Sequence, residues 1–163
     1  MVSKSKAVRE ILFRGKCVDT GIWYEGGYIH LHKTTHCHIG DPERFPDNDI
    51  HQIVFERMTD WELPNQHLRV DVNLETVGQF TGLTDKNGKR IFEGDILEER
   101  IRGRPLKDGT PGYKTRKYIV RFGGWSFYLE AIGESGRPSR CVERCKIIGN
   151  IHDNPELLEG CDG

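Results

Sequence analysis

Apolar and polar residues alternate in short runs along this chain, and that pattern predicts β-strands. The clearest run covers residues 125–132, where Trp125 and Phe127 fall on the face expected to point into a core and Tyr128 falls on the outer face. Further strands are expected at residues 11–18, 22–24, 28–32, 51–58, 70–72, 95–102, 117–122 and 144–151. Glycine pairs are expected to interrupt the second strand, at Gly26-Gly27, and to form a hairpin turn, at Gly123-Gly124.

Helical signals are short. Asn73 is expected to cap a single turn over residues 73–77. Near the C-terminus, Asn154 and Pro155 stand at the cap and first helical positions of a short helix. Residues 33–50 carry few apolar residues and two prolines, which predicts a long loop.

The stretch from Gln79 to Leu97 is the most tightly specified part of the chain. Asn87-Gly88 predicts a type I′ hairpin turn, because both residues tolerate positive φ. Gly94 predicts a second sharp bend, and the apolar residues on either side of it are expected to fill a core. Strands joined by such sharp corners are typical of small β-barrels.

These patterns predict a mostly β fold. We expect a small, SH3-like, partly open barrel in the C-terminal half, an N-terminal β-hairpin region and a short C-terminal helix. The expected division is residues 1–77, which include the long loop at 33–50, and residues 78–163, the two together forming one structural unit.

Composition and charge limit the expected ligands and the expected cellular location. The formal net charge of −1 over 163 residues gives no global basic footprint for nucleic acid. The five cysteines, with neither a signal peptide nor an apolar run of membrane-spanning length, predict a reduced, cytoplasmic protein with no membrane partner.

One candidate site is a locally basic hairpin. Only Asp108 opposes the cations between residues 100 and 121, and aromatic residues follow. Such a hairpin could bind a phosphate backbone and stack bases. The candidate residues are Arg100, Arg102, Arg104, Lys107, Arg116, Lys117 and Tyr128, with Lys114 and Arg121 nearby. The alternative is cross-strand charge pairing on a solvated face, with Glu99 opposite Lys117.

A second candidate site is rich in histidine. His30 and His32 are expected to share one face of a strand, and the loop that follows adds His36, Cys37 and His38. Imidazole and thiolate are preferred zinc ligands, although the spacing matches none of the known zinc motifs. The alternative is a solvated polar face, so no cofactor is assigned and zinc stays a candidate.

Motifs for catalysis are missing. The sequence has no glycine-rich phosphate loop before a helix and no Gly-x-Ser-x-Gly elbow. Asp85, Glu93 and Asp95 are close in sequence, but each falls in a turn where an acidic residue is expected for backbone reasons. No catalytic residue is therefore assigned.

Three segments resemble the YopX family. They are residues 75–96, whose sequence is ETVGQFTGLTDKNGKRIFEGDI, residues 148–158, IGNIHDNPELL, and residues 9–15, REILFRG. The segments occur in the family's order, and the chain departs from the pattern in its longer insertion at 33–50.

The resemblance implies a small bacteriophage or prophage protein with a mostly β, barrel-like fold, and it implies no chemistry. We therefore expect a non-catalytic binding or interaction module in the bacterial host cytoplasm, engaging an unidentified protein, itself or nucleic acid. Two alternatives stay open: single-stranded nucleic-acid binding through the hairpin at 100–121, and a zinc domain built on the cluster at 30–38.

Overall fold

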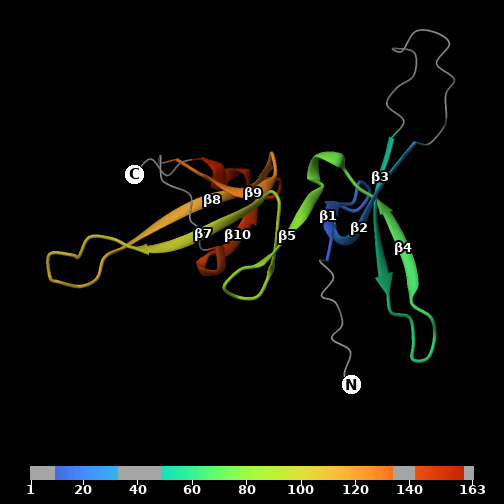
Figure 1. Cartoon of the computed structure of the whole chain (residues 1–163), viewed down its shortest axis with the longest axis horizontal. Coiled ribbons are helices and arrows are strands. Elements are labelled where there is room, and N and C mark those ends of the chain that lie inside the picture. The colour runs from blue at the N-terminus through green and yellow to red at the C-terminus, as the bar shows by residue number, and fades with distance from the viewer. Residues whose placement is uncertain (1–9, 33–48, 134–141, 160–163) are drawn as a thin grey trace, which may run out of the picture. The chain divides into compact units, whose positions relative to one another are not determined.

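A computed structural model describes residues 10–32, 49–133 and 142–159 of the chain. The chain forms two compact units, one of residues 11–78 and one of residues 79–163 with residues 1–10. The described residues are mostly strand, with three short 3-10 helices, which confirms the expected mostly β class (Figure 1). Among them, none lies in a helix long and apolar enough to cross a bilayer.

The unit of residues 11–78 is built from antiparallel strands whose neighbours follow the order β4-β3-β2-β1. Its elements are β1 (Phe13–Lys16), β2 (Trp23–His32), β3 (Asp49–Arg57), β4 (Gln66–Asp71) and the 3-10 helix η2 (Leu74–Thr76). Ile53 is fully buried, and Cys17 pairs with Val72 in an isolated β-bridge. As predicted, Asn73 caps η2, since its side chain accepts a hydrogen bond from the Glu75 N–H at 3.1 Å.

The expected interruption of β2 at Gly26-Gly27 is wrong, because the strand runs through both glycines. Gly26 is buried, and a Cβ atom at this position would clash with the backbone carbonyl of Val54 on β3. The glycine therefore allows a close approach of two strands rather than a break.

The unit of residues 79–163 contains a second antiparallel sheet, with strand order β10-β7-β8-β9. Its elements are β5 (Gly78–Thr84), β6 (Arg90–Phe92), β7 (Asp95–Arg102), β8 (Tyr113–Gly123), β9 (Ser126–Ala131), η3 (Val142–Arg144), β10 (Lys146–Asn150) and η4 (Pro155–Leu158). Its core contains Ile91, Leu97, Tyr118, Val120, Leu129 and Cys145.

This sheet is open, so the described residues form no closed barrel, and the expected partly open, SH3-like barrel is not confirmed. The strand lengths explain the difference: the edge strands β10 and β9 have five and six residues, whereas β7 has eight and β8 eleven. Short neighbours cannot wrap strands of that length, and a barrel needs matched strands. The expected C-terminal helix is a single 3-10 turn of four residues, Pro155–Leu158, with no hydrogen bond from a side chain at its cap.

The turn between β5 and β6 differs from the predicted type I′ turn. Gly88 has a φ of 80°, but Asn87 is not among the residues with positive φ, and a type I′ turn requires both. The Asp85 carboxylate shapes the turn instead, since it accepts hydrogen bonds from the N–H groups of Asn87 and Lys89. The predicted bend at Gly94 is confirmed by its φ of 80°.

The turn between β8 and β9 lies one residue later than predicted. Gly123 pairs with Ser126, so Gly124 and Trp125 form the loop. Trp125 is therefore 99% exposed at the tip, and its assignment to the core is wrong. Phe127 packs against the core and Tyr128 is half-exposed, as the alternation predicted.

Candidate functional site

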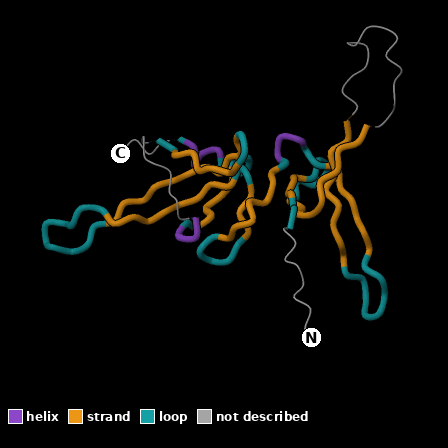
Figure 2. The backbone as a smooth tube through the Cα atoms, viewed as in Figure 1, coloured by secondary structure: helices purple, strands orange, loops and turns teal. Residues whose placement is uncertain are grey.

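Strands β7 and β8 continue beyond their neighbours as a two-stranded ribbon (Figure 2). Among the described residues, β10 pairs with β7 no further than Glu98, and β9 reaches β8 no further than the carbonyl of Lys117. We call residues 99–117 the basic arm. Its strands are joined by a loop over residues 103–112, in which the Gly103 N–H donates to the Gly112 carbonyl at 2.9 Å.

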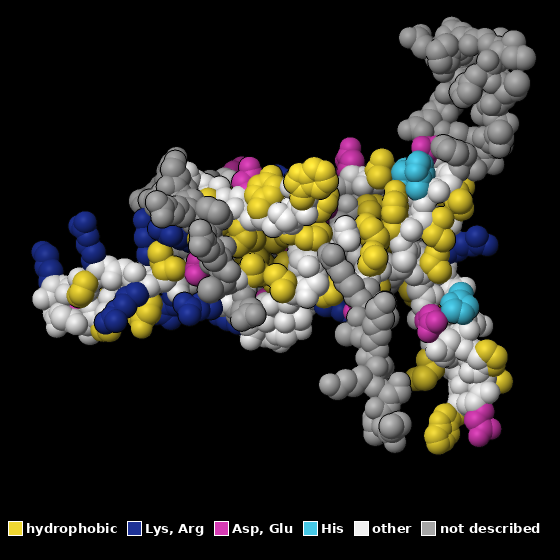
Figure 3. Space-filling model, viewed as in Figure 1, with side chains coloured by type: hydrophobic (Ala, Val, Ile, Leu, Met, Phe, Trp, Pro, Cys, Tyr) yellow, Lys and Arg dark blue, Asp and Glu magenta, His cyan; other side chains and the backbone are white. Residues whose placement is uncertain are grey.

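The basic arm concentrates positive charge. It contains seven Lys and Arg residues and two acidic residues, a net charge of +5. Since the whole chain carries −1, the other residues together carry −6. Figure 3 shows lysine and arginine side chains along the same ribbon. The charge of the arm is therefore opposite in sign to that of the remaining chain.

The register divides the arm's cations between two faces. Residues directly opposite on paired strands share a face, and alternate residues share it along each strand. Arg100, Arg102 and Lys117 lie on one face, with Tyr113 opposite Arg102. Arg116 lies on the other face, opposite Glu99, so the expected pairing of Glu99 with Lys117 is wrong by one residue. Lys114 shares the face of Arg116, and Arg104 and Lys107 lie in the loop.

Tyr113 is the aromatic residue that belongs to the arm. The Arg100 guanidinium carbon lies 3.9 Å from the centroid of its ring, a cation–π contact, and the residue is 58% exposed. The proposed stacking residue Tyr128 lies on β9 opposite Arg121, and the buried Ile119 separates it from Lys117 along that face. Sequence reasoning missed Tyr113 because it placed the start of β8 four residues later.

The end of the arm is organised by Asp108. Its carboxylate accepts hydrogen bonds from the hydroxyl of Thr110 and from the Thr110 N–H at 3.0 Å. The hydrogen bond from the Thr110 hydroxyl, followed by that from the Thr110 N–H, lowers the pKa of Asp108. One of the arm's two carboxylates is thus engaged within the loop. The other, on Glu99, accepts from the Tyr118 hydroxyl at 3.2 Å.

The histidine candidates fall partly outside the described residues. His36, Cys37 and His38 lie there, as does the side chain of His32, although His32 pairs with Asp49 in the β2–β3 ladder. His30 lies on β2 directly opposite His51 on β3.

The structure brings His30 together with two residues that the sequence did not single out, Asp49 and His51. Their nearest ligand atoms all lie within 4.8 Å of one another. The His30 Nε2 atom is 2.7 Å from the Asp49 Oδ2 atom, and the two imidazole rings stack with centroids 4.8 Å apart. The Tyr28 hydroxyl lies 2.6 Å from His51 Nδ1. A β2–β3 hairpin register would have revealed the group, but the long connection at 33–50 hides that register.

The three acidic residues near the β5–β6 turn bind backbone amides. The Asp85 carboxylate accepts from the Ile147 N–H at 3.1 Å as well as from its own turn. The buried Asp95 accepts from the Phe92 N–H at 2.8 Å, and Glu93 accepts from the Phe122 N–H at 3.4 Å. The local hydrogen bonds support the turn-chemistry interpretation of Asp85 and Asp95, whereas the hydrogen bond of Glu93 comes from a distant strand, β8.

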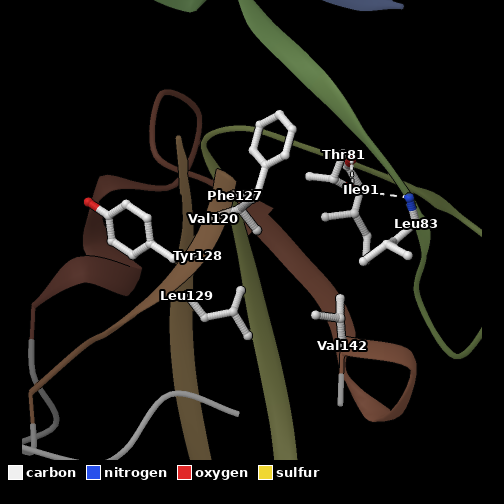
Figure 4. Close-up of a pocket in the computed structure, with 8 residues that line it drawn as sticks. All are labelled: Thr81, Leu83, Ile91, Val120, Phe127, Tyr128, Leu129 and Val142. Carbon is white, nitrogen blue, oxygen red and sulfur yellow. Dashed lines mark hydrogen bonds between the residues drawn. The ribbon is translucent and has the colours of Figure 1, made fainter. Parts of the chain in front are cut away.

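A small pocket lies beside the core of this unit (Figure 4). It has a volume of about 60 Å³ and is lined by Thr81, Leu83, Ile91, Val120, Phe127, Tyr128, Leu129 and Val142. Its threonine hydroxyl donates to the Ile91 carbonyl at 2.9 Å and accepts from the Leu83 N–H at 3.2 Å. Ligand pockets usually measure roughly 300–1,000 Å³, so this one is too small for an ordinary metabolite.

The antiparallel hairpins and the basic arm define a small, mostly β protein whose charge is strongly segregated. The chain belongs to the YopX family, because the family model described as YopX protein matches residues 12–159. This establishes the relationship that residues 75–96 and 148–158 predicted.

Comparison with solved structures supports the fold. The crystal structure of protein EF1440 from Enterococcus faecalis is similar to this chain with a TM-score of 0.50 and 23% sequence identity. The similarity covers 93% of this chain and 100% of that one. No curated protein matches the chain. At this identity the likeness concerns the fold alone.

Proposed function

We propose that this YopX-family protein is a non-catalytic binding module that binds single-stranded nucleic acid through its basic arm. We further propose that it acts in the cytoplasm of a bacterial host as a phage or prophage accessory protein, a setting that rests on the family resemblance. The observation that carries the binding proposal is the net charge of +5 on a ribbon that projects beyond both neighbouring strands.

Charge segregation supports a polyanionic ligand. A protein of net charge −1 has no general attraction to phosphate, but the local field near the arm is positive. A projecting ribbon also lets a ligand reach cations on both of its faces and in its loop. Lysine and arginine on a solvated edge can instead guard against aggregation, which requires no particular ligand.

The aromatic residue of the arm favours single strands over duplexes. Tyr113 is more than half exposed and lies on the same face as Arg100, Arg102 and Lys117. An unpaired base can stack on a tyrosine ring while its phosphates meet the neighbouring cations. Bases in a duplex are already stacked, so a duplex would use the cations alone.

The proposal predicts weaker oligonucleotide binding when the arm loses charge. We compare Arg102→Gln, Arg104→Gln, Arg116→Gln and Lys117→Gln combined with a control that combines Arg57→Gln, Arg69→Gln, Lys86→Gln and Lys89→Gln. Both variants change the net charge from −1 to −5, since each removes four positive charges. The control positions are exposed and lie outside the arm.

Fluorescence anisotropy with a labelled single strand of about 20 nucleotides measures affinity between about 50 and about 200 mM salt. We expect the arm variant to bind at least about tenfold more weakly than wild type. Its slope of log K against log salt should be shallower by about 0.7 for each phosphate that the arm no longer neutralises, up to about 3 for four phosphates. The control variant should retain most of the wild-type affinity.

Three results would contradict the proposal. Wild-type binding that ignores salt would remove the electrostatic mechanism, and equal weakening in the two variants would show that net charge alone decides binding. A duplex of the same length that binds as tightly as the single strand would remove the preference for unpaired bases.

A further inference from the structure

The group formed by Tyr28, His30, Asp49 and His51 lies on one face of the β2–β3 hairpin, in the unit that does not carry the basic arm. His30 and His51 are directly opposite, and Asp49 shares their face because it stands two residues before His51 on β3. Directly opposite residues in an antiparallel pair have Cβ atoms about 4.5–5.5 Å apart. Two paired strands therefore hold all three side chains close together.

The donor atoms of this group are those that zinc prefers. Two imidazole nitrogens and one carboxylate oxygen match the three-ligand sets of open zinc sites, whose fourth position holds water or substrate. Zinc lies about 2.0–2.2 Å from such ligands, so ligands around it are a little over 3 Å apart. The present separations are 2.7 Å between His30 Nε2 and Asp49 Oδ2 and at most 4.8 Å within the group, on either side of that value.

Tyr28 supplies a second interaction of the kind that orients a metal-binding histidine. Its hydroxyl is 2.6 Å from Nδ1 of His51, and its ring stacks on that imidazole at an interplanar angle of 4°. A tautomer in which Nδ1 donates its proton to the Tyr28 oxygen leaves Nε2 able to bind a metal.

We propose that His30, Asp49 and His51 form an open zinc site on the β2–β3 face, with Tyr28 positioning His51. The site is solvent-accessible, since the side chains of His30 and Asp49 are 45% and 24% exposed. Three protein ligands leave at least one position for water or for a ligand atom from a partner. Binding would also connect β2 to β3 beside the residue 33–48 connection.

The test uses the full chain, purified without an affinity tag and stripped with a chelator. Titration with zinc chloride by calorimetry should give one zinc per chain, and thermal unfolding should shift upward by several degrees when zinc is in excess over its Kd. Titration with Co²⁺ should give visible absorption bands of four- or five-coordinate cobalt, a signature that a hydrogen-bonded cluster without metal does not produce.

Single variants then identify the ligands. His30→Ala, Asp49→Asn and His51→Gln should each weaken zinc binding at least about tenfold. Tyr28→Phe should weaken it by about tenfold, the lower end of the cost of removing an orienting hydrogen bond. His67→Ala is the matched control, because His67 lies on β4, 3.8 Å from the Glu56 carboxylate and outside the group of His30, Asp49 and His51. Its zinc affinity should equal that of wild type.

The combined variant His36→Ala, Cys37→Ser and His38→Ala tests the competing cluster suggested by the sequence. It should still bind one zinc per chain. The proposal would be overturned by loss of zinc binding in this variant or in His67→Ala, or by unchanged zinc binding in His51→Gln. It would also be overturned if the wild-type protein takes up no zinc at micromolar concentrations. Circular dichroism shows whether each variant has folded. If His51→Gln does not fold, His30→Ala still tests the site, because it changes an exposed side chain.

Discussion

At the scale of single residues, Asp85 connects two distant parts of the chain. It is 5% exposed, and its carboxylate accepts hydrogen bonds from Asn87 and Lys89 in its own turn and from Ile147 on β10. Burial is the largest single influence and by itself raises the pKa of Asp85. The backbone hydrogen bonds from Lys89, Ile147 and Asn87 together outweigh burial, so this pKa is lowered.

Asp85→Asn should destabilise the protein at neutral pH. The amide of asparagine keeps one acceptor oxygen but places an NH2 donor where the other carboxylate oxygen accepted from N–H groups, and hydrogen bonds to a charged group contribute about 1.5–3 kcal/mol each. We expect a loss of about 2–3 kcal/mol in the free energy of unfolding, measured by urea denaturation. Asp108→Asn is the control, since Asp108 accepts similar hydrogen bonds in an exposed loop, and its denaturation midpoint should not move.

The stability lost in Asp85→Asn should depend on pH. The pKa of Asp85 is lower in the folded state than its unfolded value of about 3.9, so its stabilising contribution is complete above about pH 4. It is lost as the pH falls through the folded-state pKa. The difference in stability between wild type and Asp85→Asn should therefore shrink on acidification below about pH 4. A difference that grows instead would contradict this assignment.

The hydrogen bonds that Asp85 accepts within its own turn could be predicted from the sequence. An aspartate before Asn-Gly is expected to bond its own turn, and it does. The hydrogen bond from Ile147 comes from 62 residues away, and no local pattern predicts such an interaction. The same limit hid the meeting of His30 with Asp49 and His51, which depends on the register across a long connection.

At the scale of elements, the packing of β2 against β3 depends on one glycine. Gly26 is buried where a side chain would strike the Val54 carbonyl, whereas a Cβ on Gly27 would have its nearest neighbour, the same carbonyl, at 4.0 Å. Neither residue has a positive φ. The two adjacent glycines therefore differ in the space available for a side chain and not in backbone strain.

Gly26→Ala should destabilise the protein and Gly27→Ala should not. Forcing an atom into a packed site costs about 1–3 kcal/mol, whereas replacing an exposed strand glycine costs nothing in packing. Urea or thermal denaturation of the two variants measures this contrast. Equal effects would show that the close approach at Gly26 relaxes without cost.

Strand types were easier to predict than strand ends. The strand predicted at residues 95–102 has the bounds of β7, because the bend at Gly94 marks where it begins. For β8, Tyr113, Lys114 and Arg116 lie in a ribbon exposed on both faces, so hydrophobic alternation gives no signal there. The pattern therefore predicts an arm shorter than the one observed, without Tyr113.

At the scale of the whole molecule, the stability of the fold and the charge of the arm lie in different residues. Between residues 99 and 117 the described structure buries only Gly112, whereas the neighbouring parts of the same strands supply Ile96, Leu97, Tyr118, Ile119 and Val120 to the core. The arm carries +5 of a chain whose net charge is −1. Folding and binding should therefore be separable by removing the arm.

A shortened chain tests this separation. Glu99 and Arg116 are directly opposite on β7 and β8, and Gly103 and Gly112 are joined by a backbone hydrogen bond. Hydrogen-bonded and non-hydrogen-bonded pairs alternate along an antiparallel ladder, so Glu99 and Arg116, four residues further along each strand, are also a hydrogen-bonded pair. A two-residue hairpin turn joins such a pair, so Asn-Gly should be able to replace residues 100–115. This removes five cations and one carboxylate, a net loss of four positive charges.

We expect the shortened protein to unfold within a few degrees of wild type, because no core side chain is removed, and to lose at least about tenfold in affinity for a single-stranded oligonucleotide. Calorimetric melting and fluorescence anisotropy measure the two quantities on one sample. A large fall in melting temperature would show that the arm supports the fold. If the shortened chain folds and still binds the oligonucleotide, the binding surface lies outside the arm, whatever the effect of the charge-neutralising variant.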